Sequence, residues 1–144
     1  MFFLFSLLFA CQDYTVAGIE KRQADILVYP DHIDFGHLLS GIESTSQAFI
    51  VANTGDEDLN IFAPNLVAGT DRFGLELEDD SYLVAAGELL EFTVTYIPET
   101  FESNGGYITI ISDDEDEPEM LVTLEGYGDA PVMSVSPLEF DYGD

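Results

Sequence analysis

The stretch LLEFTVTYIP, which occupies residues 89–98, decides the fold of this chain. Every second residue in it is apolar, so that one side of an extended backbone is formed by Leu90, Phe92, Val94 and Tyr96. The residues between them, Glu91, Thr93 and Thr95, are polar. Alternation with a period of two is the pattern of a β-strand that is buried on one face only. The stretch therefore predicts a strand that covers a hydrophobic core.

Six further segments with short apolar runs lie between residues 25 and 128. They are DILVYP with IDFG, QAFIVANTG, DLNIFAPNLVAG, RFGLEL, GGYITIIS and EMLVTLEG. Turn-forming residues separate them, notably Asn53-Thr54-Gly55 and Asn104-Gly105-Gly106. No segment has apolar residues at helical spacing over about 11 residues. Seven short strands in about 105 residues predict an all-β fold, a seven-stranded antiparallel immunoglobulin-like sandwich.

The composition bounds the size of the fold and its partners. With 144 residues the chain is long enough for one well-buried core and too short for two. It has 29 Asp and Glu residues against 3 Lys and Arg, a net charge of −26. A nucleic-acid-binding protein needs a basic surface, so nucleic acid is excluded as a partner, and an anionic membrane surface would repel the domain. The single cysteine, Cys11, excludes an internal disulfide.

The N-terminal segment MFFLFSLLFA, residues 1–10, has no charged side chain and leads directly into Cys11. It is shorter than the roughly 20 apolar residues that span a bilayer, and it matches the apolar core of a secretory signal peptide. The segment Leu8-Phe9-Ala10-Cys11 resembles the lipobox of bacterial lipoproteins. That resemblance implies a signal peptide over residues 1–10, lipidation of Cys11 and a tether over residues 11–24.

The same resemblance implies an exported protein of the bacterial outer membrane or cell surface. It would contact the membrane only through its lipid anchor. The alternatives are an ordinary signal peptide that is cut elsewhere and an unprocessed apolar N-terminus.

A seven-residue phrase occurs near both ends of the chain. Residues 30–36 and residues 137–143 both read Pro, two variable residues, a large apolar residue, Asp, an aromatic residue and Gly. The first copy begins at Pro30 and the second at Pro137, so the offset is 107 residues. A match at an offset close to the size of one sandwich domain indicates tandem modules. We therefore predict one module over residues 25–128 and the first strand of a second, truncated copy in residues 129–144.

Several short motifs follow one another in a defined order: Phe35-Gly36, Asn53-Thr54-Gly55, Ala86-Gly87, FTVTYIP at 92–98 and SDDEDEP at 112–118. In content and order they resemble the ASPM/Hydin-type (ASH) immunoglobulin-like domain of the major sperm protein-like superfamily. Bacterial versions occur in surface proteins known as choice-of-anchor D proteins. The chain departs from the pattern at Tyr96, where Phe is usual, and has Asp-Glu where Asn-Asp-Pro is common. The resemblance covers residues 25–128 and implies a sandwich domain that is usually strung in tandem.

Three acidic runs lie in predicted loops, at residues 56–58, 78–80 and 113–117. If each strand reverses the chain direction, these loops meet at one end of the sandwich, where their carboxylates repel one another. Calcium, which takes about six to eight oxygen ligands, would relieve that repulsion. Candidate ligands are Asp56, Asp58, Asp79, Asp80, Asp113, Asp114 and Asp116. The alternatives are a solvated acidic face and an acidic recognition patch for a basic partner, and no other cofactor is expected.

The sequence contains none of the common catalytic motifs: no G-x-S-x-G, no H-E-x-x-H, no phosphate-binding loop and no cysteine pair. His32 and His37 are five residues apart, and an odd spacing in an extended strand would place them on opposite faces. We therefore expect two separate, solvent-facing histidines, no shared metal site between them and no catalytic residues.

These observations predict a non-enzymatic, exported surface lipoprotein that acts as a spacer, in adhesion or as a protein-interaction domain. Its expected partners are other proteins or surface polymers. The alternative is an accessory domain of a larger exported enzyme whose catalytic part lies beyond residue 144. A ciliary or centrosomal location, as in eukaryotic relatives of the ASH domain, is opposed by the lipobox-like start and the strong acidity.

Overall fold

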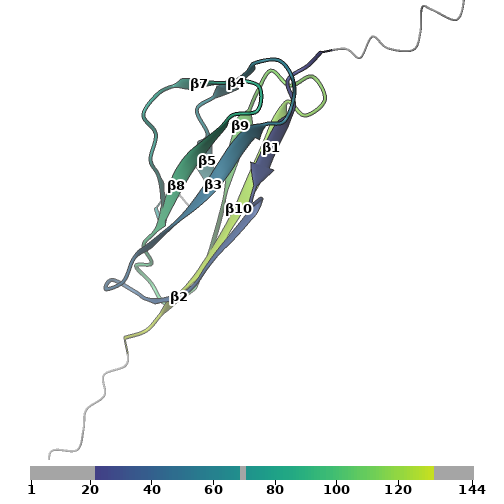
Figure 1. The fold of residues 1–144 in the computed structure, drawn as a ribbon. Helices are drawn as coiled ribbons and strands as arrows, with labels where there is room; N and C mark the ends of the chain where they lie inside the picture. Colours follow the sequence, from purple (N-terminus) through teal and green to yellow (C-terminus); the bar gives the residue numbers. More distant parts are fainter. Residues whose placement is uncertain (1–21, 69–70, 132–144) are drawn as a thin grey trace, which may run out of the picture.

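The computed structural model describes residues 22–68 and 71–131, and every regular element in these ranges is a β-strand (Figure 1). The strands are β1 (Ile26–Tyr29), β2 (His32–Leu39), β3 (Thr45–Asn53), β4 (Leu59–Phe62), β5 (Asn65–Ala68), β6 (Phe73–Leu75), β7 (Ser81–Val84), β8 (Leu89–Tyr96), β9 (Ser103–Ile111) and β10 (Glu119–Asp129). Within these ranges there is no helix of the length and hydropathy that crossing a membrane requires. The predicted all-β class is confirmed.

Two four-stranded sheets form the two layers of the sandwich. The first sheet has the order β1-β3-β8-β6 and the second β2-β10-β9-β5, while β4 and β7 form a separate pair (Figure 1). All of these pairings are antiparallel except β2 with β10, which run parallel. The arrangement is an immunoglobulin-like sandwich, as the sequence predicts.

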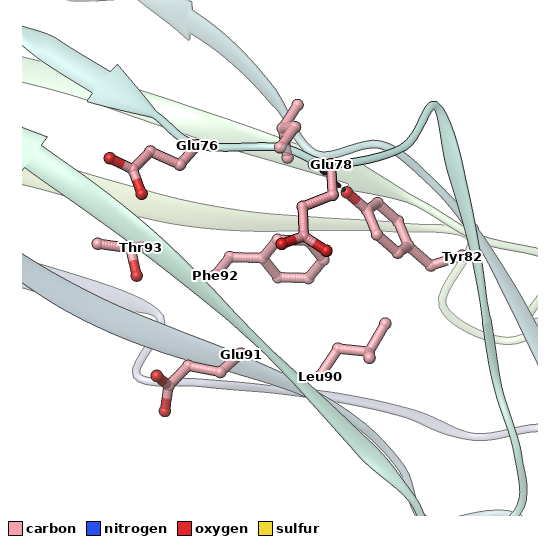
Figure 2. A pocket seen from close by; sticks show the side chains of 8 residues that line it. Glu76, Glu78, Tyr82, Leu90, Glu91, Phe92 and Thr93 are labelled. Carbon is pink, nitrogen blue, oxygen red and sulfur yellow. Dashed lines mark hydrogen bonds between the residues drawn. The ribbon is translucent and has the colours of Figure 1, made fainter.

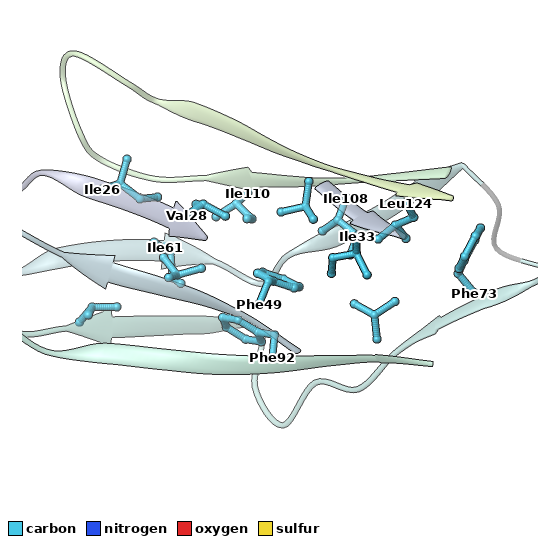
Figure 3. Close-up of a cluster of buried hydrophobic side chains, with 14 of the residues drawn as sticks. Ile26, Val28, Ile33, Phe49, Ile61, Phe73, Phe92, Ile108, Ile110 and Leu124 are labelled. Carbon is cyan, nitrogen blue, oxygen red and sulfur yellow. The ribbon is translucent and has the colours of Figure 1, made fainter. Parts of the chain in front are cut away.

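The hydrophobic core fills the space between the two large sheets (Figure 3). On β8 the predicted alternation is confirmed, because Phe92, Val94 and Tyr96 are buried and Leu90 is half-buried beside them. Phe49 of β3 has no exposed surface and stacks on Phe92, with the ring centroids 5.4 Å apart. Removing such side chains from water is the main favourable term in folding.

Residues 22–68 and 71–131 form ten strands where the sequence predicts seven, because two predicted segments are divided and β7 lies outside the predicted segments. Pro30, which has no N–H to donate, separates β1 from β2, and the two strands join different sheets. Pro64 separates β4 from β5 in the same way. The region after Arg72 gives only the short β6, and the chain then forms β7, which pairs with β4. Prolines within an apolar run therefore mark changes of sheet here.

Gly126 of β10 faces the core. An added Cβ at Gly126 would lie 2.5 Å from the ring of Tyr96, which is fully buried. The Tyr96 hydroxyl donates to Asn104 Oδ1 at 3.2 Å, and burial raises the pKa of this phenol, which keeps its proton on the donor. Gly126 thus provides the space in which the tyrosine ring lies.

Gly126→Ala is therefore expected to lower the free energy of unfolding by about 1–3 kcal/mol, since overpacking a core forces side chains and backbone to shift. Urea denaturation checks this. The control is Gly105→Ala on the neighbouring β9, where the nearest atom to an added Cβ is Leu124 O at 3.8 Å, an ordinary contact. The control is expected to keep or slightly raise stability, and equal losses in the two variants would contradict the steric explanation.

The sandwich has two ends, which we call the entry pole and the exit pole. The entry pole comprises residues 22–25 and the loops 53–58 and 112–118; the exit pole comprises the loops 40–44 and 97–102 and residues 129–131. At the exit pole Ser40 N donates to Asp129 O at 2.9 Å and Gly41 N to Pro98 O at 2.8 Å. Figure 1 shows that the described chain begins at one pole and ends at the other.

Candidate functional site

Asp114 lies at the centre of the entry pole and is only 2% exposed. Its Oδ2 accepts a hydrogen bond from Ile26 N at 2.9 Å, and its Oδ1 accepts from Asp116 N at 2.9 Å and Glu117 N at 3.2 Å. Burial by itself would raise the pKa of this carboxyl, but the three backbone N–H groups outweigh it and lower the pKa below its ordinary value. The ionised carboxylate thus ties β1 to the loop before β10.

Asp25, Asp114 and Glu117 have carboxylate oxygens within 4.8 Å of one another. Asp114 belongs to the predicted calcium ligands, whereas Asp25 and Glu117 do not. Asp25 was missed because it is 89 residues from Asp114 and comes close only through the position of β1. Glu117 lies within one of the acidic runs but was not singled out by any local pattern.

Three more of the predicted ligands make hydrogen bonds inside the protein. Asp56 accepts from Gln23 N at 3.0 Å, and Asp116 accepts from Gln23 Nε2 at 2.8 Å. The two oxygens of Asp113 accept from Asn60 N at 2.9 Å and Asn60 Nδ2 at 2.7 Å. Asp56 and Asp116 therefore tie both loops of the entry pole to Gln23 before β1, and Asp113 ties the second loop to β4.

The acidic run at residues 78–80 does not join the other two. Asp58 precedes β4 and lines a hollow of about 150 Å³ at the entry pole with Asp113. Asp80 O accepts from Ala63 N, which lies beyond the opposite end of the β4–β7 pair. The expectation that all three runs share one pole is wrong for Asp79 and Asp80, because β7 lies between this run and the entry pole, where Val84 O accepts from Asn53 Nδ2. Calcium at the entry pole stays a prediction.

The two histidines lie on the same face, not on opposite faces as their spacing predicts. A bulge between β2 and β10 inserts one residue, and Gly36 has a positive φ of 71° there. His32 Nε2 lies 3.3 Å from Glu125 Oε1, and His37 Nδ1 lies 3.0 Å from Asp129 Oδ1. Both imidazoles are exposed, as expected, and both lie over the outer face of β10.

The first sheet has an open groove at the edge of β8, which we call the β8 groove (Figure 2). Its volume is about 290 Å³, and it is lined by Glu76, Leu77, Glu78, Tyr82, Leu90, Glu91, Phe92 and Thr93. β6 pairs only with the last three residues of β8, and the final backbone bond runs from Glu76 N to Thr93 O at 3.3 Å. After that bond the segment from Glu76 to Glu78 diverges from β8, and the groove lies between this segment and β8.

Tyr82 fixes the path of the departing chain. Its hydroxyl accepts from Glu78 N and from Asp79 N, both at 3.0 Å. Its ring packs edge-on against Phe92, with the centroids 5.2 Å apart and the planes at 83°. The wall of the groove is therefore anchored to the core.

The groove was not predicted. In the sequence, Glu91 and Thr93 are typical of the solvent-facing side of a strand. Nothing in the sequence indicates the residue at which β6 stops pairing with β8. The remaining predicted site residue, Cys11, lies outside the described residues, as do the N-terminal segment 1–21 and residues 132–144 of the predicted second copy.

The HYDIN/CFA65/VesB-like, Ig-like domain family matches residues 25–127. Among solved structures, the fold is similar to the ASH/PapD-like domain 7 of human CEP192, with 13% identity, a TM-score of 0.58 and coverage of 82% of this chain and 98% of that one. A protein of unknown function from Porphyromonas gingivalis W83 has 16% identity and a TM-score of 0.61 over 79% of this chain and 51% of that one. The VesB protease of Vibrio cholerae has 14% identity and a TM-score of 0.56 over 73% of this chain and 32% of that one.

The chain thus spans about half of the P. gingivalis protein and about a third of VesB. At these identities the structural similarity concerns the fold alone. No curated protein sequence matches the chain. The family match and the sandwich with its strand order together confirm the ASH-type resemblance, and the chain belongs to the HYDIN/CFA65/VesB-like family of Ig-like domains.

Proposed function

We propose that this domain is a non-enzymatic spacer and protein-interaction module, repeated in tandem on an exported surface protein that is anchored through a lipid on Cys11. The observation that carries the proposal is the position of the repeated phrase relative to β10. Applied to β1, the offset of 107 residues predicts from the sequence that the first strand of a second copy occupies residues 133–136. β10 ends at Asp129, so this prediction leaves residues 130–132 as the connection.

A connection of three residues spans at most about 10 Å. Because the described chain begins and ends at opposite poles, the next module would follow end to end, with its entry pole against this exit pole (Figure 1). Two exposed apolar side chains support such a contact. Ile42 is 68% exposed and Phe101 is 70% exposed, and they lie in the two exit-pole loops that the Gly41–Pro98 hydrogen bond joins.

A two-module chain tests this proposal. In it, residues 22–136 are followed directly by residues 30–131 of a second copy. Pro30 of the second copy then stands where Pro137 stands in the sequence, so the offset of 107 residues is kept. Small-angle X-ray scattering is expected to show a rod with nearly twice the maximum dimension of the single module, residues 22–131. Ile42→Ser with Phe101→Ser is expected to loosen the junction and broaden the distribution of lengths. A folded-back or freely jointed pair in the unsubstituted chain would contradict the proposal.

A second candidate function is an accessory domain of an exported enzyme. The observation that favours it is the similarity to VesB, a protease of which the matched region forms 32%. Sequencing the gene beyond codon 144 separates the two functions. Further copies of the repeated phrase favour the spacer, whereas a G-x-S-x-G or H-E-x-x-H motif favours the enzyme.

A further inference from the structure

We propose that the β8 groove binds an extended, basic peptide segment, which pairs with the free edge of β8 as an added strand. This site is independent of whether the modules are repeated in tandem. The proposal rests on the backbone of β8, the shape of the groove and its charge.

The backbone of β8 offers unpaired hydrogen-bonding groups at the groove. In a strand, the N–H and C=O of one residue point to one edge and those of the next residue to the other. Thr93 O bonds to Glu76 N on the β6 side, so the groups of Leu89 and Glu91 point to that side as well. β3 covers the other edge of β8, and no backbone bond within residues 22–68 and 71–131 engages these groups on the β6 side. An open sheet edge of this kind is a template for another strand.

The groove keeps this edge open. The segment that would otherwise continue β6 is held away from β8 by the two hydrogen bonds to the Tyr82 hydroxyl. Phe92 forms the floor, Leu90 is half-buried, and Leu77 is 42% exposed at the wall. An incoming strand therefore finds both backbone partners and an apolar surface for alternate side chains.

The charge of the groove selects a basic segment. Figure 2 shows the carboxylates of Glu76, Glu78 and Glu91 around the opening. In the described part of the chain none of the three forms an ion pair, and the two arginines there, Arg22 and Arg72, pair with carboxylates elsewhere. A segment that alternates apolar and basic residues would place the apolar ones over Phe92 and the basic ones beside Glu91.

The test is titration of the full chain with the acetylated, amidated peptide VKVKV, measured by calorimetry and by NMR. At about 150 mM salt, charges more than about 8 Å apart are largely screened, which suppresses the general attraction of an acidic protein for a cation. We expect the backbone amide of Glu91 to shift and to become protected from hydrogen exchange. A peptide with N-methyl groups on its β8-facing amides is expected to bind at least tenfold more weakly.

Matched variants separate a specific site from general electrostatics. The triple variant Glu76→Gln, Glu78→Gln, Glu91→Gln is expected to weaken peptide binding at least tenfold. The control, Glu57→Gln, Asp58→Asn, Glu119→Gln, removes the same charge away from the groove and is expected to change binding less than twofold. Equal weakening in both triple variants, or unchanged binding of the N-methylated peptide, would overturn the proposal.

Discussion

Asn53→Asp is expected to lower the free energy of unfolding by about 3–5 kcal/mol. Asn53 is 1% exposed, and both the nitrogen and the oxygen of its side-chain amide form hydrogen bonds. Nδ2 donates to Glu57 O at 2.6 Å and Val84 O at 3.0 Å, while Oδ1 accepts from Asp25 N at 3.2 Å and Gly55 N at 3.0 Å. An aspartate keeps the acceptor but turns a charged oxygen toward two carbonyl oxygens. Uncompensated buried charges and unsatisfied buried groups carry costs of this size.

Urea denaturation of the two proteins measures this loss. The matched control is Asn65→Asp, which adds the same charge at an exposed position of β5 and is expected to stay within about 0.5 kcal/mol of the wild type. If both variants lose the same stability, the general charge of the protein is the cause and the explanation from the four hydrogen bonds fails.

Asp114→Asn is expected to lower the free energy of unfolding by about 2–4 kcal/mol at pH 7. The substitution replaces one carboxylate oxygen by an NH₂ group. In the place of Oδ2 this group faces the N–H of Ile26, and in the place of Oδ1 it removes the acceptor of Asp116 N and Glu117 N. Hydrogen bonds to charged groups contribute about 1.5–3 kcal/mol each. The exposed Asp58→Asn is the control, expected within about 0.5 kcal/mol of the wild type.

The same variant gives a pH dependence of known sign. The pKa of Asp114 is lower in the folded protein than its ordinary value of 3.8. The ionised form therefore stabilises the fold above pH ~4, and this contribution is lost as the pH falls through the folded pKa. The difference in unfolding free energy between wild type and Asp114→Asn should be constant from pH 7 to pH 5 and shrink below pH 4. A difference that grows with acidity would contradict the assignment.

The fold was predictable because its signals are local. Phe92, Val94 and Tyr96 alternate with polar residues, and the burial of each follows from that alternation alone. The Asn53-Thr54-Gly55 turn was equally visible, although only the structure shows that the asparagine side chain holds the turn to β7. Periodicity and turn chemistry thus predict the class of fold without knowledge of which strands pair.

The candidate sites were less predictable because they depend on contacts between distant segments. The bulge at Gly36 shifts His37 to the face of His32, and spacing alone does not reveal a bulge. Asp25 and Asp114 meet only because β1 lies beside the loop before β10. The β8 groove exists because β6 ends early, at Leu75. The hydroxyl of Tyr82, four residues beyond Glu78, binds Glu78 N and holds the segment after β6 away from β8. None of these contacts leaves a periodic pattern in the sequence.

The parallel pairing of β2 with β10 has a mechanical consequence. Both strands run toward the exit pole and pair from His32 opposite Thr123 to Leu39 opposite Asp129, with the bulge at Gly36 between these ends. Tension between the two ends of the module would pull these strands in opposite directions along their length. Such shear loads the whole row of backbone hydrogen bonds at once, whereas peeling would break them one after another. The sandwich would therefore resist stretching along its length before it opened.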